Sequence, residues 1–275
     1  MAEKALSSLT IRIMSALVLA PVVLGLVWVG GLPFLVLMGL AAALIAYELK
    51  TLLLGGQRSD MFLLGCAGVL VVAIAGVGAP EAGLVMGLGG CLSGIAWRIW
   101  RRQPLLPVIL AHVYLAVPLV ALIWFRMDPS YGLAAVLWLL AVVWATDIFA
   151  YAAGRTIGGP KLAPSISPGK TWAGLAGGMA GALVVGLATG FVLGGGPGFI
   201  LPLLSVMLAV AAQAGDLFES ALKRRAGVKD SSRLIPGHGG ILDRVDGLVA
   251  AASIAALVAL LHGGPTPGAG VLIWP

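Results

Sequence analysis

Long apolar stretches dominate this chain, and short polar segments separate them. The apolar runs are about 17–25 residues long, enough to cross a bilayer as a helix, and they lack the two-residue alternation of a membrane β-barrel. Because backbone amides in lipid must be satisfied within a helix or a closed barrel, we predict an all-α, polytopic membrane bundle of about nine helices. The predicted spans are residues 11–29, 33–49, 61–79, 82–97, 105–125, 131–151, 172–193, 198–215 and 246–262.

The composition agrees with this pattern. Hydrophobic residues make up 60% of the chain, charged residues make up 10%, and the mean hydropathy is +1.06. A water-facing surface requires more charge, so lipid is the expected solvent for most of the protein. Many of the 40 glycines lie inside apolar runs, which indicates closely packed helices. The net charge of +6 favours anionic lipids and phosphorylated substrates over nucleic acid, which would require a basic soluble domain.

The positions of lysine and arginine predict the orientation of the spans. These residues are retained on the cytoplasmic side of a membrane. With a cytoplasmic N-terminus, the nine spans place all but one of the 17 Lys and Arg residues on that side and leave only Arg126 outside. The first span lacks a cleavage site of the A-x-A type, so we expect a retained anchor rather than a cleaved signal.

Three parts follow from this topology. Residues 1–130 hold five spans and form a scaffold without a motif, and residues 263–275 form a short non-cytoplasmic tail. The functional region is 131–262, because its cytoplasmic loops 152–171 and 216–246 combine acids, bases, Ser, Thr, Gly and His. The two halves of the chain do not mirror one another, so an inverted-repeat transporter is not indicated.

The loop 216–246 carries the densest group of ionisable residues. If the eighth span continues as a helix beyond the interface, the side chains of Asp216, Glu219, Ser220 and Lys223 share one face. This alone is equally typical of a solvated helix end with charge pairs. Further polar residues and glycines follow before the ninth span: Arg224, Lys229, Asp230, His238, Gly239, Gly240, Asp243, Arg244 and Asp246.

This combination predicts a site for a magnesium-bound polyphosphate. Asp243 and Asp246 are three residues apart and can converge with Asp216 on one hard cation. Lysines and arginines would neutralise the remaining phosphate charge, and the glycines beside His238 permit close approach of the backbone. At a membrane surface, this favours phosphoryl or nucleotidyl transfer over ion conduction.

The loop 152–171 and the span before it contribute a second set of candidates. Asp147, Tyr151 and Arg155 follow one another at four-residue steps, and an acid near the end of an apolar span is costly unless it is paired or faces water. Ser167, Lys170 and Thr171 are typical of a phosphate-holding loop, although a Ser-Pro followed by Lys can simply cap a helix. A Walker A loop is excluded, because the upstream glycine is missing.

The motifs resemble those of the phosphatidate cytidylyltransferases. The stretch Ser220 to Asp246 has their serine, Lys-Arg, Lys-Asp and H-G-G-x-x-D-R-x-D at the family's spacing. Asp147 to Arg155 is similar to their D-x-x-A-Y-x-x-G-R segment, and Ser165 to Trp172 to their S-P-x-K-T-W segment. The resemblance covers about residues 140–260. Two positions depart from many relatives, which have lysine at Gly169 and glutamate at Ala173.

The resemblance implies transfer of the cytidylyl group of CTP to phosphatidic acid, which gives CDP-diacylglycerol and pyrophosphate with Mg²⁺ as cofactor. A second ion, divalent or monovalent, stays open. The implied setting is the cytoplasmic membrane of a bacterium, with the site facing the cytoplasm among membrane lipids, in a homodimer. We expect the metal on Asp216, Asp243 and Asp246, and the phosphates on Lys223, Arg224, Lys229 and Arg244.

The other candidates receive supporting roles. His238 is expected to donate a hydrogen bond to phosphate, with a loop-capping histidine as the alternative. Asp230 and Glu219 are expected to orient the residues that touch substrate, and Asp147 to contact metal or cytidine. The remaining predicted substrate-binding residues are Tyr151, Arg155, Ser167, Lys170, Thr171, Ser220, Gly239 and Gly240.

Two other classes of protein compete with this interpretation. A CDP-alcohol phosphotransferase would carry a D-G-x-x-A-R run, which is missing, and a polyprenyl-phosphate sugar-phosphate transferase is the related alternative. A channel or carrier would distribute polar residues through several spans, whereas here they concentrate near one face of the membrane.

Overall fold

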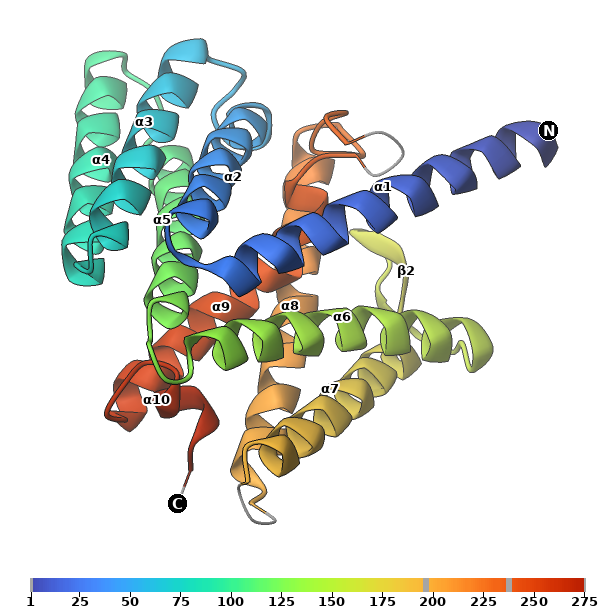
Figure 1. The fold of residues 1–275 in the computed structure, drawn as a ribbon. Coiled ribbons are helices and arrows are strands. Elements are labelled where there is room, and N and C mark those ends of the chain that lie inside the picture. Colours follow the sequence, from blue (N-terminus) through green and yellow to red (C-terminus); the bar gives the residue numbers. More distant parts are fainter. Residues whose placement is uncertain (1, 195–197, 236–238, 275) are drawn as a thin grey trace. The chain divides into compact units, whose positions relative to one another are not determined.

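The protein folds into helices connected by short loops (Figure 1). The computed structural model describes residues 2–194, 198–235 and 239–274, and the side chains within these ranges apart from 2–13 and 16. Two compact units form, unit 1 from Met1–Ile123 and Leu222–Val245 and unit 2 from Trp124–Ala221 and Asp246–Pro275. The elements are α1 (Ala2–Val29), α2 (Gly31–Leu52), α3 (Arg58–Gly76), α4 (Pro80–Trp100), α5 (Leu106–Arg126), α6 (Gly132–Thr156), β1 (Lys161–Ala163), β2 (Ser167–Thr171), α7 (Trp172–Val192), α8 (Ile200–Arg225), α9 (Leu242–His262) and α10 (Ala269–Leu272).

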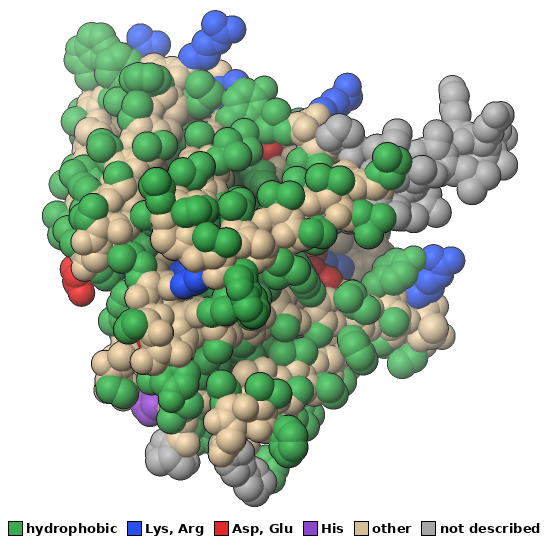
Figure 2. All heavy atoms as spheres, in the orientation of Figure 1, with side chains coloured by type: hydrophobic (Ala, Val, Ile, Leu, Met, Phe, Trp, Pro, Cys, Tyr) green, Lys and Arg blue, Asp and Glu red, His purple; other side chains and the backbone are tan. Residues whose placement is uncertain are grey.

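The prediction of an all-α polytopic membrane bundle is confirmed. Each predicted span overlaps one of the helices α1 to α9. Among the described residues, the eight helices α2 to α9 are long and apolar enough to cross a membrane, and α1 adds the shorter apolar segment Leu17–Val29. Figure 2 shows hydrophobic side chains over the outward faces of α2, α3 and α4. Such large apolar faces are stable in contact with lipid but unfavourable in contact with water, so this is an integral membrane protein.

A buried arginine fixes one end of unit 1. Arg98 donates through Nη2 and Nε to Oδ2 of Asp60 at 2.6 and 3.1 Å, and Nη2 also donates to the carbonyl of Leu54 at 3.2 Å. Its Nη1 donates to the carbonyl of Pro104 at 3.0 Å. Arg98 and Asp60 are 4% and 3% exposed. The end of α2, the start of α3, the end of α4 and the start of α5 therefore meet at one end of the unit.

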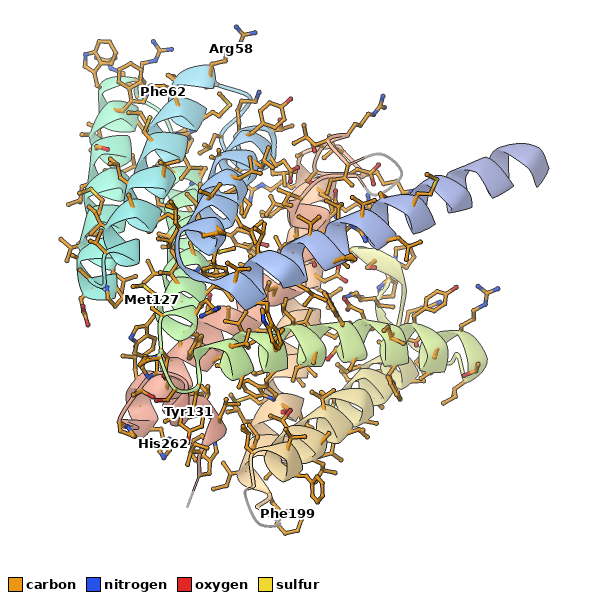
Figure 3. The ribbon with its side chains drawn as sticks, viewed as in Figure 1. Arg58, Phe62, Met127, Tyr131, Phe199 and His262 are labelled. Atoms are coloured by element: carbon orange, nitrogen blue, oxygen red, sulfur yellow. The ribbon has the colours of Figure 1, made fainter. Side chains whose placement is uncertain are left out.

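Arg98→Ala is expected to lower the free energy of unfolding by about 3–5 kcal/mol, because it leaves Asp60 charged and buried without its partner. Thermal unfolding of purified protein in detergent measures the change. Arg58→Ala is the control, because Arg58 is an exposed cation at the same end of the unit (Figure 3). If both variants unfold at the same temperature, the buried pair does not stabilise this end.

Glycines let the helices of unit 2 approach closely. The helices α6 and α7 lie side by side (Figure 1). A Cβ atom at Gly174 would lie 3.0 Å from the carbonyl oxygen of Ala150, and one at Gly178 would lie 3.0 Å from that of Thr146. The packing role predicted for the glycines inside spans is therefore confirmed here, and it brings the start of α7 against the last turns of α6.

A small β-hairpin precedes α7. Strands β1 and β2 pair antiparallel, with Lys161 opposite Thr171 and Ala163 opposite Ser167. The sequence indicated a loop at 152–171, and the structure adds these two short strands within it. The strands are short, and Pro168 and Gly169 disfavour β structure in a sequence-based prediction.

The connection between α5 and α6 is tied to the C-terminal segment. The carboxylate of Asp128 accepts hydrogen bonds from the backbone N–H groups of Ser130 at 2.8 Å, Tyr131 at 3.0 Å and Gly268 at 2.7 Å. Burial opposes ionisation of this carboxyl. Hydrogen bonds from the Thr266 side chain and these amides outweigh burial and hold the pKa of Asp128 below its ordinary value.

The C-terminal segment is packed rather than loose. All four residues of α10 are buried, and the ring of His262 stacks on Trp274 with 3.9 Å between ring centroids. Figure 3 labels Tyr131 and His262 at this end of unit 2. Because Asp128 lies just before α6 and the hairpin just follows it, the tail lies at the opposite end of α6 from the hairpin.

The lowered pKa of Asp128 predicts that acid destabilises unit 2. The folded state binds a proton at this carboxyl more weakly than the unfolded state, so its stabilisation is complete above the ordinary pKa and is lost as the pH falls through the lowered one. Asp128→Asn should cost about 1–3 kcal/mol near neutral pH and weaken the loss of thermal stability below about pH 4. Equal pH dependence in wild type and variant would contradict this.

Candidate functional site

The predicted site residues form two groups, one in each unit. The α6 cavity is a hollow of about 490 Å³ in unit 2. The α9 cluster is a set of hydrogen-bonded residues in unit 1 around the start of α9, namely Glu48, Lys223, Ser231, Ser232, Gly240 and Asp243.

The α6 cavity collects residues from four elements. One face of α6, the strand β2, the first turn of α7 and the last third of α8 contribute to it. The packing of α7 on α6 carries β2 toward this face of α6. The lining residues are Asp147, Ala150, Tyr151, Gly154, Arg155, Ser167, Gly169, Lys170, Thr171, Gly174, Leu175, Gln213 and Asp216. The candidates from loop 152–171 and its preceding span therefore share one cavity with Asp216.

An ion pair lies within this cavity. Lys170 Nζ is 2.6 Å from Oδ2 of Asp216 and donates to Oε1 of Gln213 at 3.0 Å. The side chains of Lys170 and Asp216 are 15% and 33% exposed, so the pair is shielded but reachable from the cavity. Ser220 donates to the other oxygen of Asp216 at 3.3 Å. The sequence motifs alone do not assign Gln213 to the site.

Tyr151 and Arg155 form a second pair at the cavity. Arg155 Nη1 donates to the hydroxyl of Tyr151 at 2.6 Å, and its guanidinium lies 5.9 Å from the centre of the Tyr151 ring. Both side chains are exposed, so a flat ring and a cation are presented together to solvent. Asp147, four residues before Tyr151, is also exposed to the cavity.

Thr171 has a structural duty in addition to lining the cavity. Its hydroxyl accepts a hydrogen bond from the backbone N–H of Gly174 at 3.0 Å and thereby caps the N-terminus of α7. The sequence suggested capping by the Ser-Pro followed by Lys, whereas the residue that caps α7 is Thr171. Ser167 and Lys170 do not cap the helix, and their side chains line the cavity.

Helices α8 and α9 approach each other next to two of the predicted metal ligands. A Cβ atom at Gly215 would lie 2.6 Å from the carbonyl oxygen of Asp246, so only a glycine permits this contact. Asp216 follows Gly215 directly. Asp246 Oδ1 accepts a hydrogen bond from the N–H of Gly247 at 2.7 Å. Unit 2 therefore brings the backbones that carry Asp216 and Asp246 together.

In the α9 cluster, the carboxylate of Asp243 is surrounded by donors. Its Oδ1 lies 2.6 Å from Lys223 Nζ. Its Oδ2 accepts from the N–H and hydroxyl of Ser231 at 2.9 and 2.8 Å and from the N–H of Gly240 at 2.8 Å. The side chains of Lys223 and Asp243 are 11% and 7% exposed. Both oxygens of Asp243 are thus engaged by the protein itself.

Glu48 lies beneath the same loop. Its carboxylate accepts from the hydroxyls of Ser231 and Ser232 at 2.9 and 2.7 Å and from the N–H groups of Ile241 and Leu242, both at 2.8 Å. The side chain is fully buried. The sequence indicates only a scaffold role for residues 1–130 and does not predict this contact. The one signal is an acid within an otherwise apolar span.

The other predicted residues of this loop lie nearer the surface. Lys229, Asp230 and Arg244 are exposed, and so is Arg224, whose Nη1 donates to a nearby carbonyl at 3.4 Å. Gly239 has a φ of +82°, which favours glycine, and forms an isolated β-bridge to Ile235.

Two candidates differ from these. His238 lies outside the described residues. Glu219 is fully buried in α8, which fits its predicted orienting role and not direct contact with substrate.

Comparison with known proteins identifies the family. The profile of the cytidylyltransferase family matches residues 10–262. A phosphatidate cytidylyltransferase of Brucella abortus biovar 1 (strain 9-941) is 38% identical over 266 residues, 94% of this chain and 96% of that protein. Phosphatidate cytidylyltransferases of Haemophilus influenzae and Bacillus subtilis are each 44% identical, over 56% and 50% of this chain and 57% and 52% of their own. The chain belongs to the cytidylyltransferase family.

Proposed function

We propose that this protein transfers the cytidylyl group of CTP to phosphatidic acid and so makes CDP-diacylglycerol and pyrophosphate for phospholipid synthesis. The names of its relatives support this reaction. The structural observation that carries it is a lysine–aspartate ion pair in each unit, Lys170 with Asp216 in unit 2 and Lys223 with Asp243 in unit 1.

Each pair combines a positive and a negative group, as a magnesium nucleotide does. The ammonium group of Lys170 stands in for a hard cation at Asp216, and the carboxylate of Asp216 stands in for a phosphate oxygen at Lys170. A magnesium nucleotide offers a cation and phosphate oxygens together, so it can replace both partners without leaving either charge unpaired. A neutral substrate could not make this exchange.

The residues fit a divalent cation in part. Within either unit, the described residues include no group of three His, Cys, Asp or Glu side chains able to hold a metal alone. Magnesium commonly takes one or two protein carboxylates and completes its shell with phosphates and water, which Asp216 and Asp246 can satisfy. We propose these two residues of unit 2 as its ligands. Bound there, the ion would neutralise phosphate charge and stabilise the leaving pyrophosphate.

The protein's own residues then have two tasks. Phosphatidate is already an anion at neutral pH, so its oxygen can attack the α-phosphorus of CTP without a general base. The bond from that phosphorus to the bridging oxygen breaks, and pyrophosphate leaves with its electron pair. Lys170 in unit 2 and the basic residues Lys223, Arg224 and Arg244 in unit 1 are each proposed to neutralise phosphate charge. In unit 2, Tyr151 and Arg155 are proposed to contact the nucleotide.

The proposed setting follows from the two substrates. CTP is a cytoplasmic nucleotide, so we propose a site on the cytoplasmic side of a bacterial inner membrane. The acyl chains of phosphatidate would stay in the hydrocarbon while the phosphate reaches the site. A homodimer is proposed from the family resemblance alone, and nucleic acid is not a proposed partner.

The direct test is pyrophosphate release by purified protein in detergent. Release should require CTP, phosphatidic acid and Mg²⁺ together, and should stop when a chelator is added or when diacylglycerol, which lacks the attacking phosphate, replaces phosphatidic acid. Formation of CMP from CDP-diacylglycerol and an alcohol would instead indicate a CDP-alcohol phosphotransferase. Folded protein without any CTP-dependent turnover would contradict the proposal.

A further inference from the structure

Glu48 links the N-terminal half of the chain to the signature loop. We infer that Glu48 is a positioning residue for the reaction: a buried carboxylate that holds the loop before α9 so that Asp243 and Lys223 are correctly placed. The inference rests on the proposed function and adds to it a residue from the part of the chain that carries none of the family's motifs.

The surroundings of Glu48 match an ionised carboxylate. Four donors, two hydroxyls and two backbone N–H groups, point at its two oxygens within 2.7 to 2.9 Å. These four bonds can fill the lone-pair positions of the carboxylate. The two amides belong to Ile241 and Leu242 at the N-terminus of α9, where the free N–H groups and the helix dipole favour negative charge. These four donors are hydroxyl and backbone N–H groups, so this loop and helix end stabilise the negative charge of the carboxylate.

A chain of contacts connects Glu48 to Lys223. The hydroxyl of Ser231 lies 2.9 Å from Glu48 Oε2 and 2.8 Å from Asp243 Oδ2. A hydroxyl has one proton and donates to one carboxylate at a time, so Ser231 couples the two acids. Asp243 in turn contacts Lys223. A shift of Glu48 therefore reaches Lys223 through two intermediate residues.

The space around this chain is filled. A Cβ atom at Gly240 would collide with the Ser231 hydroxyl and with the carboxylate of Glu48. The glycine of the H-G-G motif thus allows the loop to close over Glu48.

Glu48→Gln is the informative variant. The side chain keeps its size, but its NH₂ group cannot accept a hydrogen bond. Some of the four donors around Glu48 therefore lose their acceptor. We expect kcat for CTP and phosphatidic acid to fall about 10- to 100-fold, the size of effect seen when a partner behind a site residue is lost. KM for CTP should change less than about 3-fold, because Glu48 is buried and does not touch the nucleotide. Glu48→Asp, with a shorter side chain, should restore the charge but only part of the rate.

A second measurement separates positioning from stability. Lys223 is shielded by its contact with Asp243, so we expect an amine-modifying reagent to label Lys223 faster in Glu48→Gln than in wild type, with Lys161 as the exposed internal reference. The matched control is Asp60→Asn, which alters another buried acid of unit 1 outside the α9 cluster. Peptide mass spectrometry after limited labelling measures both lysines in one sample.

The inference is supported if kcat falls and Lys223 labelling rises in Glu48→Gln but not in Asp60→Asn. It is overturned if Glu48→Gln has the wild-type kcat, or if Lys223 labelling rises equally in both variants. A wild-type protein that does not turn over CTP would defeat the proposed function, whereas the labelling contrast would still decide whether Glu48 positions Lys223.

Discussion

Asp216→Asn is expected to lower kcat by about 100-fold or more while the amount of folded protein in the membrane stays unchanged. The amide has the same shape as the carboxylate but has no negative charge to hold a cation or to balance Lys170, and charge stabilisation is commonly the largest contribution to phosphoryl-group chemistry. One third of the Asp216 side chain is exposed to the α6 cavity, so the fold depends little on its charge. Turnover by equal amounts of purified protein measures the effect.

The control for Asp216→Asn is Glu81→Gln. Glu81 is an exposed acid in the first turn of α4, and it belongs neither to the α6 cavity nor to the α9 cluster. Its substitution changes the net charge by the same amount and should leave kcat as in wild type. Asp216→Asn with more than about a tenth of wild-type kcat would remove Asp216 from the reaction.

Lys170→Met is expected to lower kcat/KM for CTP by about 100-fold. The methionine fills much of the same volume, but it cannot neutralise phosphate, and it leaves Asp216 without its cation. Lys161→Met is the matched control, because Lys161 is an exposed lysine on the other strand of the same hairpin and does not line the cavity. A loss of similar size in both variants would mean that the hairpin's general charge, and not Lys170, assists the reaction.

The effects of substituting Lys170 and Asp216 on activity should not be additive. If both contact the same magnesium nucleotide, the double variant Lys170→Met with Asp216→Asn should lose little more activity than the worse single variant, because the second change removes an interaction that is already lost. If the two residues acted independently, the fold-losses of activity of the two single variants would multiply in the double variant. The three variants and the wild type, assayed at equal folded concentrations, give this coupling directly.

Hydropathy predicted the membrane-spanning helices, and residue spacing predicted which polar site residues share a helix. The spans were predictable because lipid imposes a minimum apolar length on each helix. The continuation of the eighth span was predictable too, and α8 does extend to Arg225. Polar residues three or four positions apart in a helix lie on the same face, whatever surrounds that helix. Local chain geometry alone therefore brought Asp216 and Ser220 together in the prediction.

The tertiary partners were not predictable from the same patterns. Glu48 and Arg98 each lie near the end of a span, where a charged side chain usually reaches the interface, and nothing in their neighbours distinguishes a buried residue from an exposed one. Their partners are loop amides, hydroxyls or acids far away in the sequence. Lys170 and Asp216 were both candidates, but only the packing of α7 on α6 brings Lys170 to the cavity.

The proposed metal ligands illustrate the same limit. The sequence grouped Asp216, Asp243 and Asp246 because acids at such spacing can share a cation. In the fold, Asp243 is hydrogen-bonded by the loop that it organises, whereas Asp216 and Asp246 lie on helices in contact through Gly215. The residue type indicated that these three acids could bind a cation. Only the backbone around each acid shows that Asp243 is hydrogen-bonded by its own loop.

The fate of each phosphate of CTP tests the central proposal most directly. Purified protein is given phosphatidic acid, Mg²⁺ and CTP labelled at either the α- or the γ-phosphorus, and the lipid and water-soluble products are separated. The α label should enter the lipid fraction as CDP-diacylglycerol, and the γ label should appear in pyrophosphate in equal amount. Transfer of the γ label to lipid, or folded protein that labels no lipid at all, would contradict cytidylyl transfer by this protein.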